Sequence, residues 1–180
     1  MKTRYLLIAV LLSFCCFGES LKDVAASNVS AHVNGKVAVL PEGAFVESRD
    51  GFHQVHYNFT TEGHDAIFFE LRKPLAEGTV FTAKVQGDGS GHSLFVVVKD
   101  NSGESFYFAG PVIDFKGWKN IGIKFKYPKI NSGERYASIW GGDGNQTPDF
   151  PLQGIVVGLN DTPDTAIGSG MIVIKEIEVK

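Results

Sequence analysis

The sequence predicts an all-β protein, a sandwich of two antiparallel sheets in a single domain. Three observations predict this class. Apolar and polar residues alternate with the two-residue period of strands throughout residues 27–180. Turn residues recur about every 8–12 positions, the spacing typical of a sandwich or barrel. No stretch after residue 26 keeps a helical period, so a parallel sheet built from strand–helix–strand units is not expected.

The first 18 residues resemble a secretory signal peptide. Lys2 and Arg4 precede a nearly unbroken apolar run from residue 5 to residue 17, and Gly18 offers a small residue for cleavage. The run is short for a membrane span. We therefore expect a leader over residues 1–18, one domain over residues 19–180, and a secreted or periplasmic location. Lipidation of Cys15 or Cys16, which would give a lipid-anchored surface form, is the alternative.

Composition narrows the function further. The chain has 180 residues and a formal net charge of −3, with no cluster of basic residues, which argues against binding to nucleic acid. Both cysteines lie in the expected leader, so the sandwich has no disulfide to stabilise it. About 160 residues are enough for one self-supporting core. No transmembrane segment is predicted after the leader.

The expected strands follow from the alternation and from the turn residues between them. Asn34-Gly35 predicts a two-residue type I′ hairpin. Residues 93–99 are rich in Val and are expected to be buried on both faces. Trp118 is assigned to the core as the first apolar residue of its strand. The predicted strands are residues 29–33, 37–40, 44–47, 53–59, 66–71, 79–86, 93–99, 104–108, 118–125, 136–140, 152–159 and 171–179.

No catalytic constellation stands out. A glycosidase needs two carboxylates facing one cleft, and no predicted strand presents such a row of acids. Gly89-Ser90-Gly91 lacks the spacing of a nucleophile elbow. His53 and His56 are three residues apart, so a strand points them to opposite faces and a shared metal site is not expected. The sequence therefore favours a protein that is not an enzyme.

Aromatic residues beside polar, glycine-rich loops indicate binding of a sugar. Trp140 is followed by Gly141-Gly142, whose backbone allows a ligand to approach closely. A sugar offers apolar C–H faces to an aromatic ring and hydroxyl groups to polar side chains. Tyr107 lies between Phe106 and Phe108, so it points away from the core if that pair is buried. The candidate ligand-binding residues are Trp140, Asp143, Asn145, Gln146, Tyr107, Tyr136 and Arg135.

The order of several motifs resembles galactose-binding-like jelly-roll domains, the carbohydrate-binding-module type attached to secreted bacterial glycoside hydrolases. The resemblance rests on the glycine-rich loop 87–92, the strand 94–99 with its following turn, Gly117-Trp118, Trp140-Gly141-Gly142 and the closing segment 172–179. It implies a two-sheet jelly-roll β-sandwich without a catalytic centre. As partners it implies a polysaccharide or glycan and a secreted polysaccharide-degrading enzyme.

The resemblance also implies a structural calcium ion that joins an early loop to the last strand. In the closing strand of such domains an Asp is typical where this chain has Lys175. The remaining candidate ligands are Glu47, Asp50 and Glu176, whose oxygens suit calcium. No other cofactor is expected.

Carbohydrate binding without catalysis is the leading hypothesis from the sequence. Two alternatives stay open. The first is a structural or protein-interaction module of a cell-surface or secreted assembly. The second is a polysaccharide lyase or glycosidase built on a single sandwich.

Overall fold

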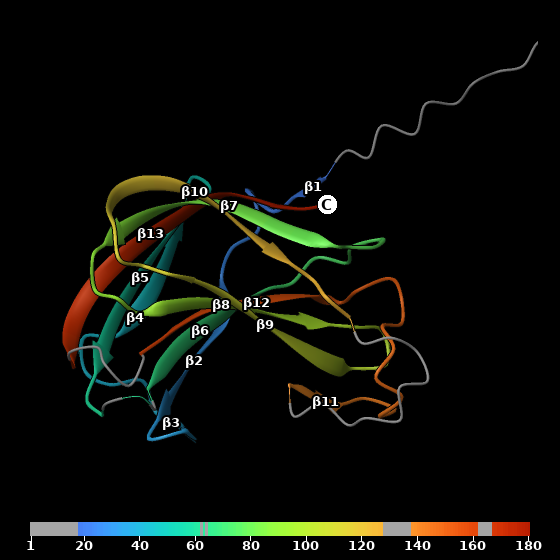
Figure 1. Cartoon of the computed structure of the whole chain (residues 1–180), viewed down its shortest axis with the longest axis horizontal. Coiled ribbons are helices and arrows are strands. Elements are labelled where there is room, and N and C mark those ends of the chain that lie inside the picture. Colours follow the sequence, from blue (N-terminus) through green and yellow to red (C-terminus); the bar gives the residue numbers. More distant parts are fainter. Residues whose placement is uncertain (1–17, 62, 64, 128–137, 162–166) are drawn as a thin grey trace, which may run out of the picture.

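The computed structural model describes residues 18–61, 63, 65–127, 138–161 and 167–180, which form thirteen strands. The predicted leader, apart from Gly18, lies outside these residues. Within them, no helix is long and apolar enough to cross a membrane. The strands are stacked as two antiparallel sheets, sheet A and sheet B, and so form the predicted sandwich (Figure 1).

Sheet A has six strands. Five of them lie in the spatial order β10 (Lys116–Lys124), β7 (Val80–Asp88), β13 (Gly168–Val179), β5 (Phe52–Phe59) and β4 (Phe45–Arg49). The short β1 (Glu19–Ser20) pairs with the end of β13, close to the C-terminus.

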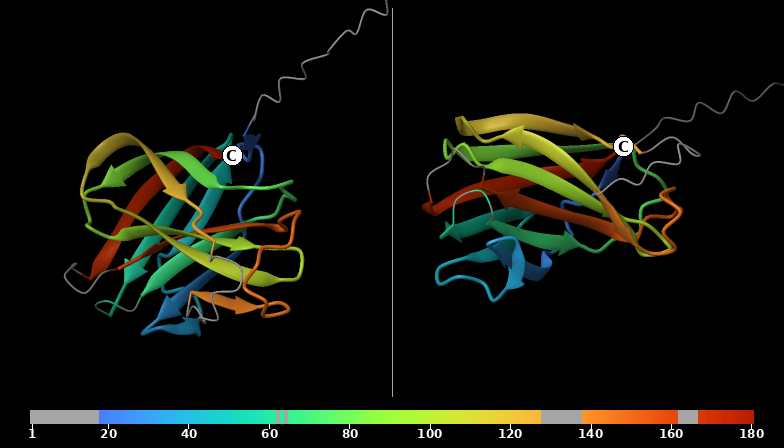
Figure 2. Two further views of the ribbon diagram at one scale, coloured as in Figure 1. Left: turned by 45° about the vertical axis from the view of Figure 1, so that its right-hand side comes forward. Right: turned by 60° about the horizontal axis from the view of Figure 1, so that its bottom comes forward.

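Sheet B has seven strands. Their spatial order is β11 (Ile139–Gly141), β9 (Glu104–Val112), β8 (Ser93–Lys99), β12 (Gly154–Asn160), β6 (Ala66–Leu71), β2 (Ser27–Val33) and β3 (Lys36–Ala38). Consecutive strands along the chain repeatedly belong to different sheets, as in a jelly roll, and Figure 2 shows the two layers from other sides.

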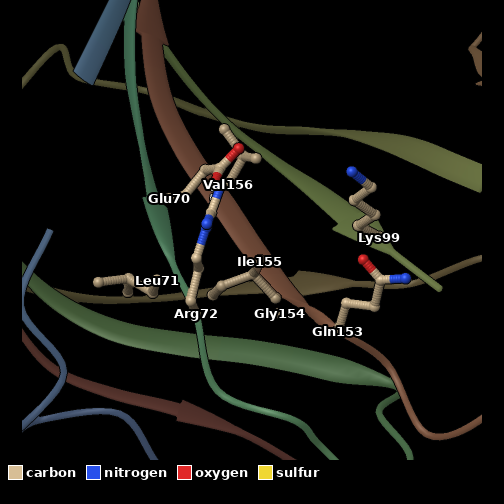
Figure 3. Close-up of a pocket in the computed structure, with 8 residues that line it drawn as sticks. All are labelled: Glu70, Leu71, Arg72, Lys99, Gln153, Gly154, Ile155 and Val156. Atoms are coloured by element: carbon tan, nitrogen blue, oxygen red, sulfur yellow. Dashed lines mark hydrogen bonds and ion pairs between the residues drawn. The ribbon is translucent and has the colours of Figure 1, made fainter. Parts of the chain in front are cut away.

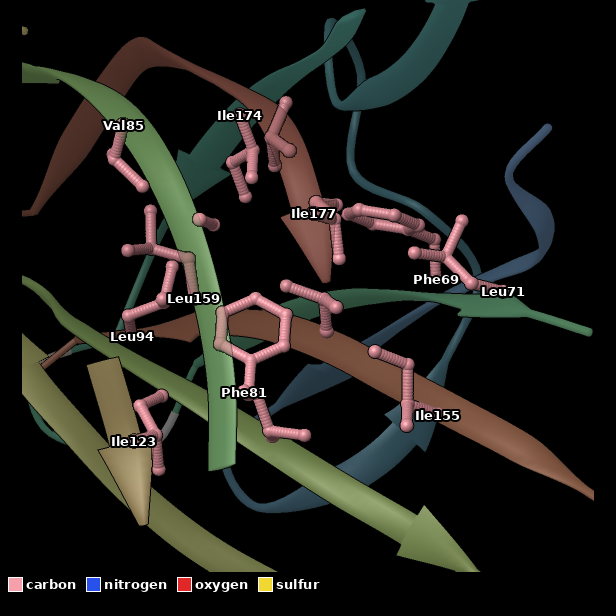
Figure 4. Packing of buried hydrophobic residues seen from close by; sticks show 14 of the residues in the cluster. Phe69, Leu71, Phe81, Val85, Leu94, Ile123, Ile155, Leu159, Ile174 and Ile177 are labelled. Atoms are coloured by element: carbon pink, nitrogen blue, oxygen red, sulfur yellow. The ribbon is translucent and has the colours of Figure 1, made fainter. Parts of the chain in front are cut away.

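The core lies between the two sheets and is filled by alternate residues of each strand. In β6, Ile67, Phe69 and Leu71 are buried while the residues between them face outward. The same parity holds in β12 and in β7, so Phe81 and Ile155 meet side chains from the opposite sheet (Figure 4). Burying this apolar surface is the main force that holds a disulfide-free sandwich together.

Several predicted local features are confirmed. Asn34 and Gly35 connect β2 to β3 with φ of 51° and 70°, the left-handed values that a type I′ turn requires. Residues 94–98 of β8 are buried on both faces, as their Val-rich sequence predicts. Phe106 and Phe108 point into the core, so Tyr107 faces outward.

The prediction that Trp118 belongs to the core is wrong. Its side chain is 43% exposed on the outer face of sheet A. Ile121 and Ile123 of the same strand point inward. Trp118 is three residues from Ile121, and an odd spacing in a strand places side chains on opposite faces. Parity along the strand, rather than apolar character, therefore decides its position.

Candidate functional site

The outer face of sheet B contains a groove of about 480 Å³ that runs across its strands. Its wall and floor come from outward-facing residues of β2, β6, β12, β8, β9 and β11. The lining residues are His32, Ala66, Phe68, Glu70, Phe95, Val97, Lys99, Ser105, Tyr107, Trp140, Val156 and Asn160.

Strand register places the aromatic residues of the groove side by side. Phe68 lies opposite Gly158, and Gly158 lies opposite Phe95 on the next strand. Because Gly158 has no side chain, the Phe95 ring extends over it, and the Phe68 and Phe95 ring centroids are 6.4 Å apart. Phe95 in turn stacks on Tyr107 at 5.3 Å. The result is a continuous aromatic surface across four strands.

The ends of this aromatic surface differ in exposure. At one end His32 meets the Phe68 ring edge-on at 5.1 Å. At the other, Tyr107 is half-buried, and burial raises the pKa of its phenol, so it stays neutral and hydrogen-bonding at physiological pH. Trp140 lies beyond it and is 50% exposed. The groove therefore offers ring faces and edges that solvent can reach.

A second, more polar hollow of about 250 Å³ continues the groove at the ends of β6 and β12. It shares Glu70, Lys99 and Val156 with the aromatic groove and adds Arg72 and Gln153 (Figure 3). Arg72 Nε and Glu70 Oε2 are 2.6 Å apart and form an ion pair. Polar side chains that can hydrogen-bond to a ligand thus follow directly on the aromatic surface.

Gly154 forms the floor of this polar hollow. A Cβ at this position would be 2.6 Å from the carbonyl oxygen of Leu71, so no other residue fits without displacing β6. Gly154 lies opposite Lys99 in the register. The glycine therefore allows the close approach of β12 to the end of β6 that borders the hollow.

Trp140 is held in place by the loop that follows it. Trp140 pairs with Ser105 and Gly141 with Glu104 in the β11–β9 register. Gly142 packs so tightly on β9 that a Cβ there would be 2.4 Å from the backbone nitrogen of Glu104. Gln146 also donates its backbone N–H to Glu104 Oε1 at 3.2 Å. Glu104 is thus the centre of the contacts that fix the Trp140 loop.

Glu104 is an unusual support because its carboxylate is buried. It is 1% exposed, and Oε2 has no hydrogen-bond partner. Burial raises its pKa, and the nearby carboxylates of Asp143, Asp100 and Asp149 raise it further. Asp100 is also buried, but its oxygens accept hydrogen bonds from Ser102 Oγ and from the backbone N–H groups of Glu104 and Asp149.

The structure brings two of the predicted ligand-binding residues, Tyr107 and Trp140, to the same groove. Asp143, Asn145 and Gln146 lie in the loop beyond Trp140 and are not among the groove's lining residues. Asn145 donates from its backbone and side-chain nitrogens to Asp143 at 3.2 and 2.6 Å, which shapes the turn. Tyr136 and Arg135 lie outside the described residues. Binding by any of these residues stays a prediction.

Sequence reasoning missed Phe68, Phe95 and Lys99 as groove residues. The alternation of faces along each strand would have found them. Phe68 lies between the inward-facing Ile67 and Phe69, and Phe95 and Lys99 share the face opposite to Leu94 and Val96. What parity does not reveal is which outward-facing residues of distant strands become neighbours.

The predicted calcium ligands are not drawn into one cluster. Asp50 is paired with Arg49, and Glu176 with Lys175. Within the described part of the chain, no group of three or more His, Cys, Asp and Glu side chains could hold a metal ion. Calcium at Glu47, Asp50 and Glu176 stays a prediction of the resemblance, to be tested by calcium titration with Glu176→Gln as the variant.

Comparison with solved structures identifies the class of fold. The chain is similar to the family 11 carbohydrate-binding module of the cellulosomal cellulase Lic26A-Cel5E of Clostridium thermocellum. The TM-score is 0.52 at 14% identity, over 91% of this chain and 94% of the module. It is also similar to PfGH50B, with a TM-score of 0.52 at 12% identity, over 91% of this chain and 24% of that protein.

No protein-family model matches the chain. No curated protein matches it in sequence. The structural matches nevertheless show the fold: a jelly-roll β-sandwich of the type found in carbohydrate-binding modules, as the resemblance in the sequence implied.

Proposed function

We propose that the protein is a non-catalytic carbohydrate-binding domain that acts outside the cytoplasm and holds a glycan chain in the groove of sheet B. The observation that carries the proposal is the continuous aromatic surface of Phe68, Phe95 and Tyr107, with the exposed Trp140 beside it. Rings of this kind stack on the apolar faces of sugars. Glu70, Arg72 and Asn160 supply hydrogen-bonding groups along the same groove.

The shape of the site supports a chain rather than a single sugar. The aromatic groove and the polar hollow share residues and therefore form one continuous depression across sheet B. Their combined length spans strands from β2 to β11. An open groove lets a polymer enter along its length, whereas a small-molecule site buries most of its ligand.

The groove gives little support to catalysis. Retaining glycosidases place two carboxyl groups about 5–5.5 Å apart around the scissile bond. Among the described residues that line the groove and the hollow, Glu70 is the one carboxylate. Its Oε2 is held by Arg72 and by Asn28 Nδ2 at 2.8 Å. This arrangement suits a fixed hydrogen-bond acceptor better than a general acid.

The test is binding to a glycan array, followed by affinity gel electrophoresis on the polysaccharides that bind. Trp140→Ala should weaken binding about tenfold or more, because aromatic residues dominate the energy of such contacts. For neutral polysaccharides Trp118→Ala is the matched control, since Trp118 is similarly exposed but lies on sheet A. A neutral polysaccharide that binds equally to both variants and to the wild type would overturn the assignment of the groove.

A protein-interaction role is the other candidate. It would be favoured if no glycan bound in the array.

Folding of each variant in the binding test is checked by its thermal unfolding, so that loss of binding is not mistaken for loss of structure.

A further inference from the structure

The outer face of sheet A carries an exposed aromatic residue surrounded by lysines. Trp118 on β10 is 43% exposed. Lys175 Nζ on β13 lies 4.7 Å from the centroid of its ring, and Lys84 Nζ on β7 lies 6.0 Å from it. Two cations from two strands thus lie near one indole ring, on the sheet opposite to the groove.

The two lysines are direct neighbours in the sheet. Lys175 lies opposite Lys84 in the β13–β7 register. Like charges directly opposite each other destabilise a sheet. Lys175 is 3.2 Å from Glu176, but Lys84 forms no ion pair within the part of the chain that the structure describes. Glu176 therefore compensates the charge of Lys175, whereas the charge of Lys84 has no carboxylate partner among the described residues.

The neighbouring residues strengthen the positive charge. β10 contains no acidic residue, and Lys116 lies two residues before Trp118 on the same strand. The chain as a whole has a net charge of −3, so this concentration of lysines is local. A surface of this kind attracts anionic partners.

A second ring completes the surface. Lys175 Nζ is also 5.1 Å from the centroid of the Phe52 ring, and Phe52 is 37% exposed. Trp118 and Phe52 thus lie on either side of the same ammonium group. We call Trp118, Phe52, Lys84 and Lys175 the Trp118 face.

We propose that the Trp118 face is a second, separate binding site that takes an acidic polysaccharide, with the carboxylate of a uronic acid residue beside Lys84 and Lys175. A uronic acid carries an anionic group and an apolar C–H face on the same ring. It can therefore pair with the lysines and stack on Trp118 or Phe52 at the same time. An acidic peptide offers the charge without that rigid apolar face.

The experiment is affinity gel electrophoresis of the full chain on polygalacturonate and alginate. The double variant Lys84→Gln/Lys175→Gln and the single variant Trp118→Ala should each weaken binding at least tenfold, since loss of a single charge-assisted or stacking contact of roughly 1.4 kcal/mol already has that effect. Lys124→Gln removes the same charge from the far end of β10 and should change the affinity less than twofold. Trp140→Ala should leave binding to the acidic polymers intact.

Two further probes separate this proposal from the groove and from simple charge attraction. Poly-L-glutamate should bind at least tenfold more weakly than polygalacturonate; equal binding would overturn the proposal. The proposal would also be overturned if neither acidic polymer retained the protein, or if Trp140→Ala abolished binding to the acidic polymers. If Trp140→Ala lost binding to neutral glycans and Trp118→Ala lost binding to acidic polymers, both sites would be supported. If acidic polymers bound through Trp118 and no neutral glycan bound, the assignment of the groove would be overturned and the Trp118 face would stand.

Discussion

The ring of Phe95 lies directly over Gly158, so closely that a Cβ on Gly158 would be 2.1 Å from Phe95 Cζ. The two residues are opposite each other on β8 and β12, in the middle of sheet B. Phe95 faces outward yet is 7% exposed, because the bare backbone at Gly158 lets the ring pack down between Phe68 and Tyr107, tilted by 57° to the Phe68 ring and by 30° to the Tyr107 ring. The floor of the groove therefore depends on this glycine.

Gly158→Ala should displace Phe95 and disturb the aromatic surface. We expect a loss of about 1–3 kcal/mol in the free energy of unfolding, the usual cost of overpacking. Binding of neutral glycans should weaken in parallel. Gly122→Ala on β10 is the control, since the nearest atom to its added methyl group is 3.8 Å away. Urea unfolding and affinity electrophoresis measure both effects, and an unchanged affinity in Gly158→Ala would contradict the role given to Phe95.

The sandwich could be predicted from the sequence because its determinants are local. Alternation marks which residues of β6 and β12 face inward, and Asn34-Gly35 fixes a hairpin within four residues. The groove could not be predicted from the sequence, since it depends on the register between strands that are far apart in the chain. Phe68 and Phe95 become neighbours through Gly158, and nothing near any of the three residues specifies that contact.

Trp118 and Trp140 illustrate the same limit. Both are exposed tryptophans at the outer face of a sheet, one in each layer. Sequence composition favoured Trp140 because of its glycine-rich loop and assigned Trp118 to the core. Parity with Ile121 corrects that assignment, but the lysines around Trp118 come from β7 and β13 and emerge from tertiary structure alone.

His53 should make stability depend on pH. Its ring is buried against Phe69, and Nδ1 is 2.9 Å from Ser48 Oγ while Nε2 has no hydrogen-bond partner. Burial lowers the pKa of His53 from 6.5 to about 4. The folded state therefore disfavours protonation, so the stability is fully present above pH 6.5 and is lost as the pH falls toward 4.

His53→Asn should reduce this pH dependence, because Asn offers an acceptor near Ser48 but does not titrate. The wild type is expected to lose about 2–3 kcal/mol from this group between neutral pH and pH 4. Urea unfolding at intervals of pH measures the slope. His92 is also buried, and burial lowers its pKa too, so some slope should remain in the variant. A slope identical to that of the wild type would show that His53 is not the cause.

Glu104 gives the opposite dependence. Burial and the surrounding carboxylates raise its pKa, so the folded state favours the protonated form. Its contribution to stability is present at low pH and is lost as the pH rises above the ordinary range of a carboxyl group. Glu104→Gln keeps an acceptor for Gln146 N–H and removes the buried charge.

The Glu104→Gln variant should therefore be more stable than the wild type at pH 7–8, by about 1–2 kcal/mol, with the difference shrinking toward pH 4. Glu42→Gln changes the net charge equally from an exposed position and should have little effect. Thermal unfolding across this pH range measures the difference. A destabilised Glu104→Gln, together with stabilisation of the wild type by added calcium, would instead indicate that Glu104 supports a bound cation.

Tyr107 tests whether the groove recognises its ligand through ring faces or through hydroxyl groups. Its ring stacks on Phe95 with centroids 5.3 Å apart. Tyr107→Phe keeps this ring and removes the hydroxyl, so it should retain most of the affinity for neutral glycans. Tyr107→Ala removes the ring and should weaken binding about tenfold, because it also frees Phe95 to tilt. Calorimetric titration with the best neutral ligand separates these cases. If Tyr107→Phe lost as much affinity as Tyr107→Ala, the hydroxyl would be the recognition group, and the groove would bind by hydrogen bonding at this position instead of by stacking.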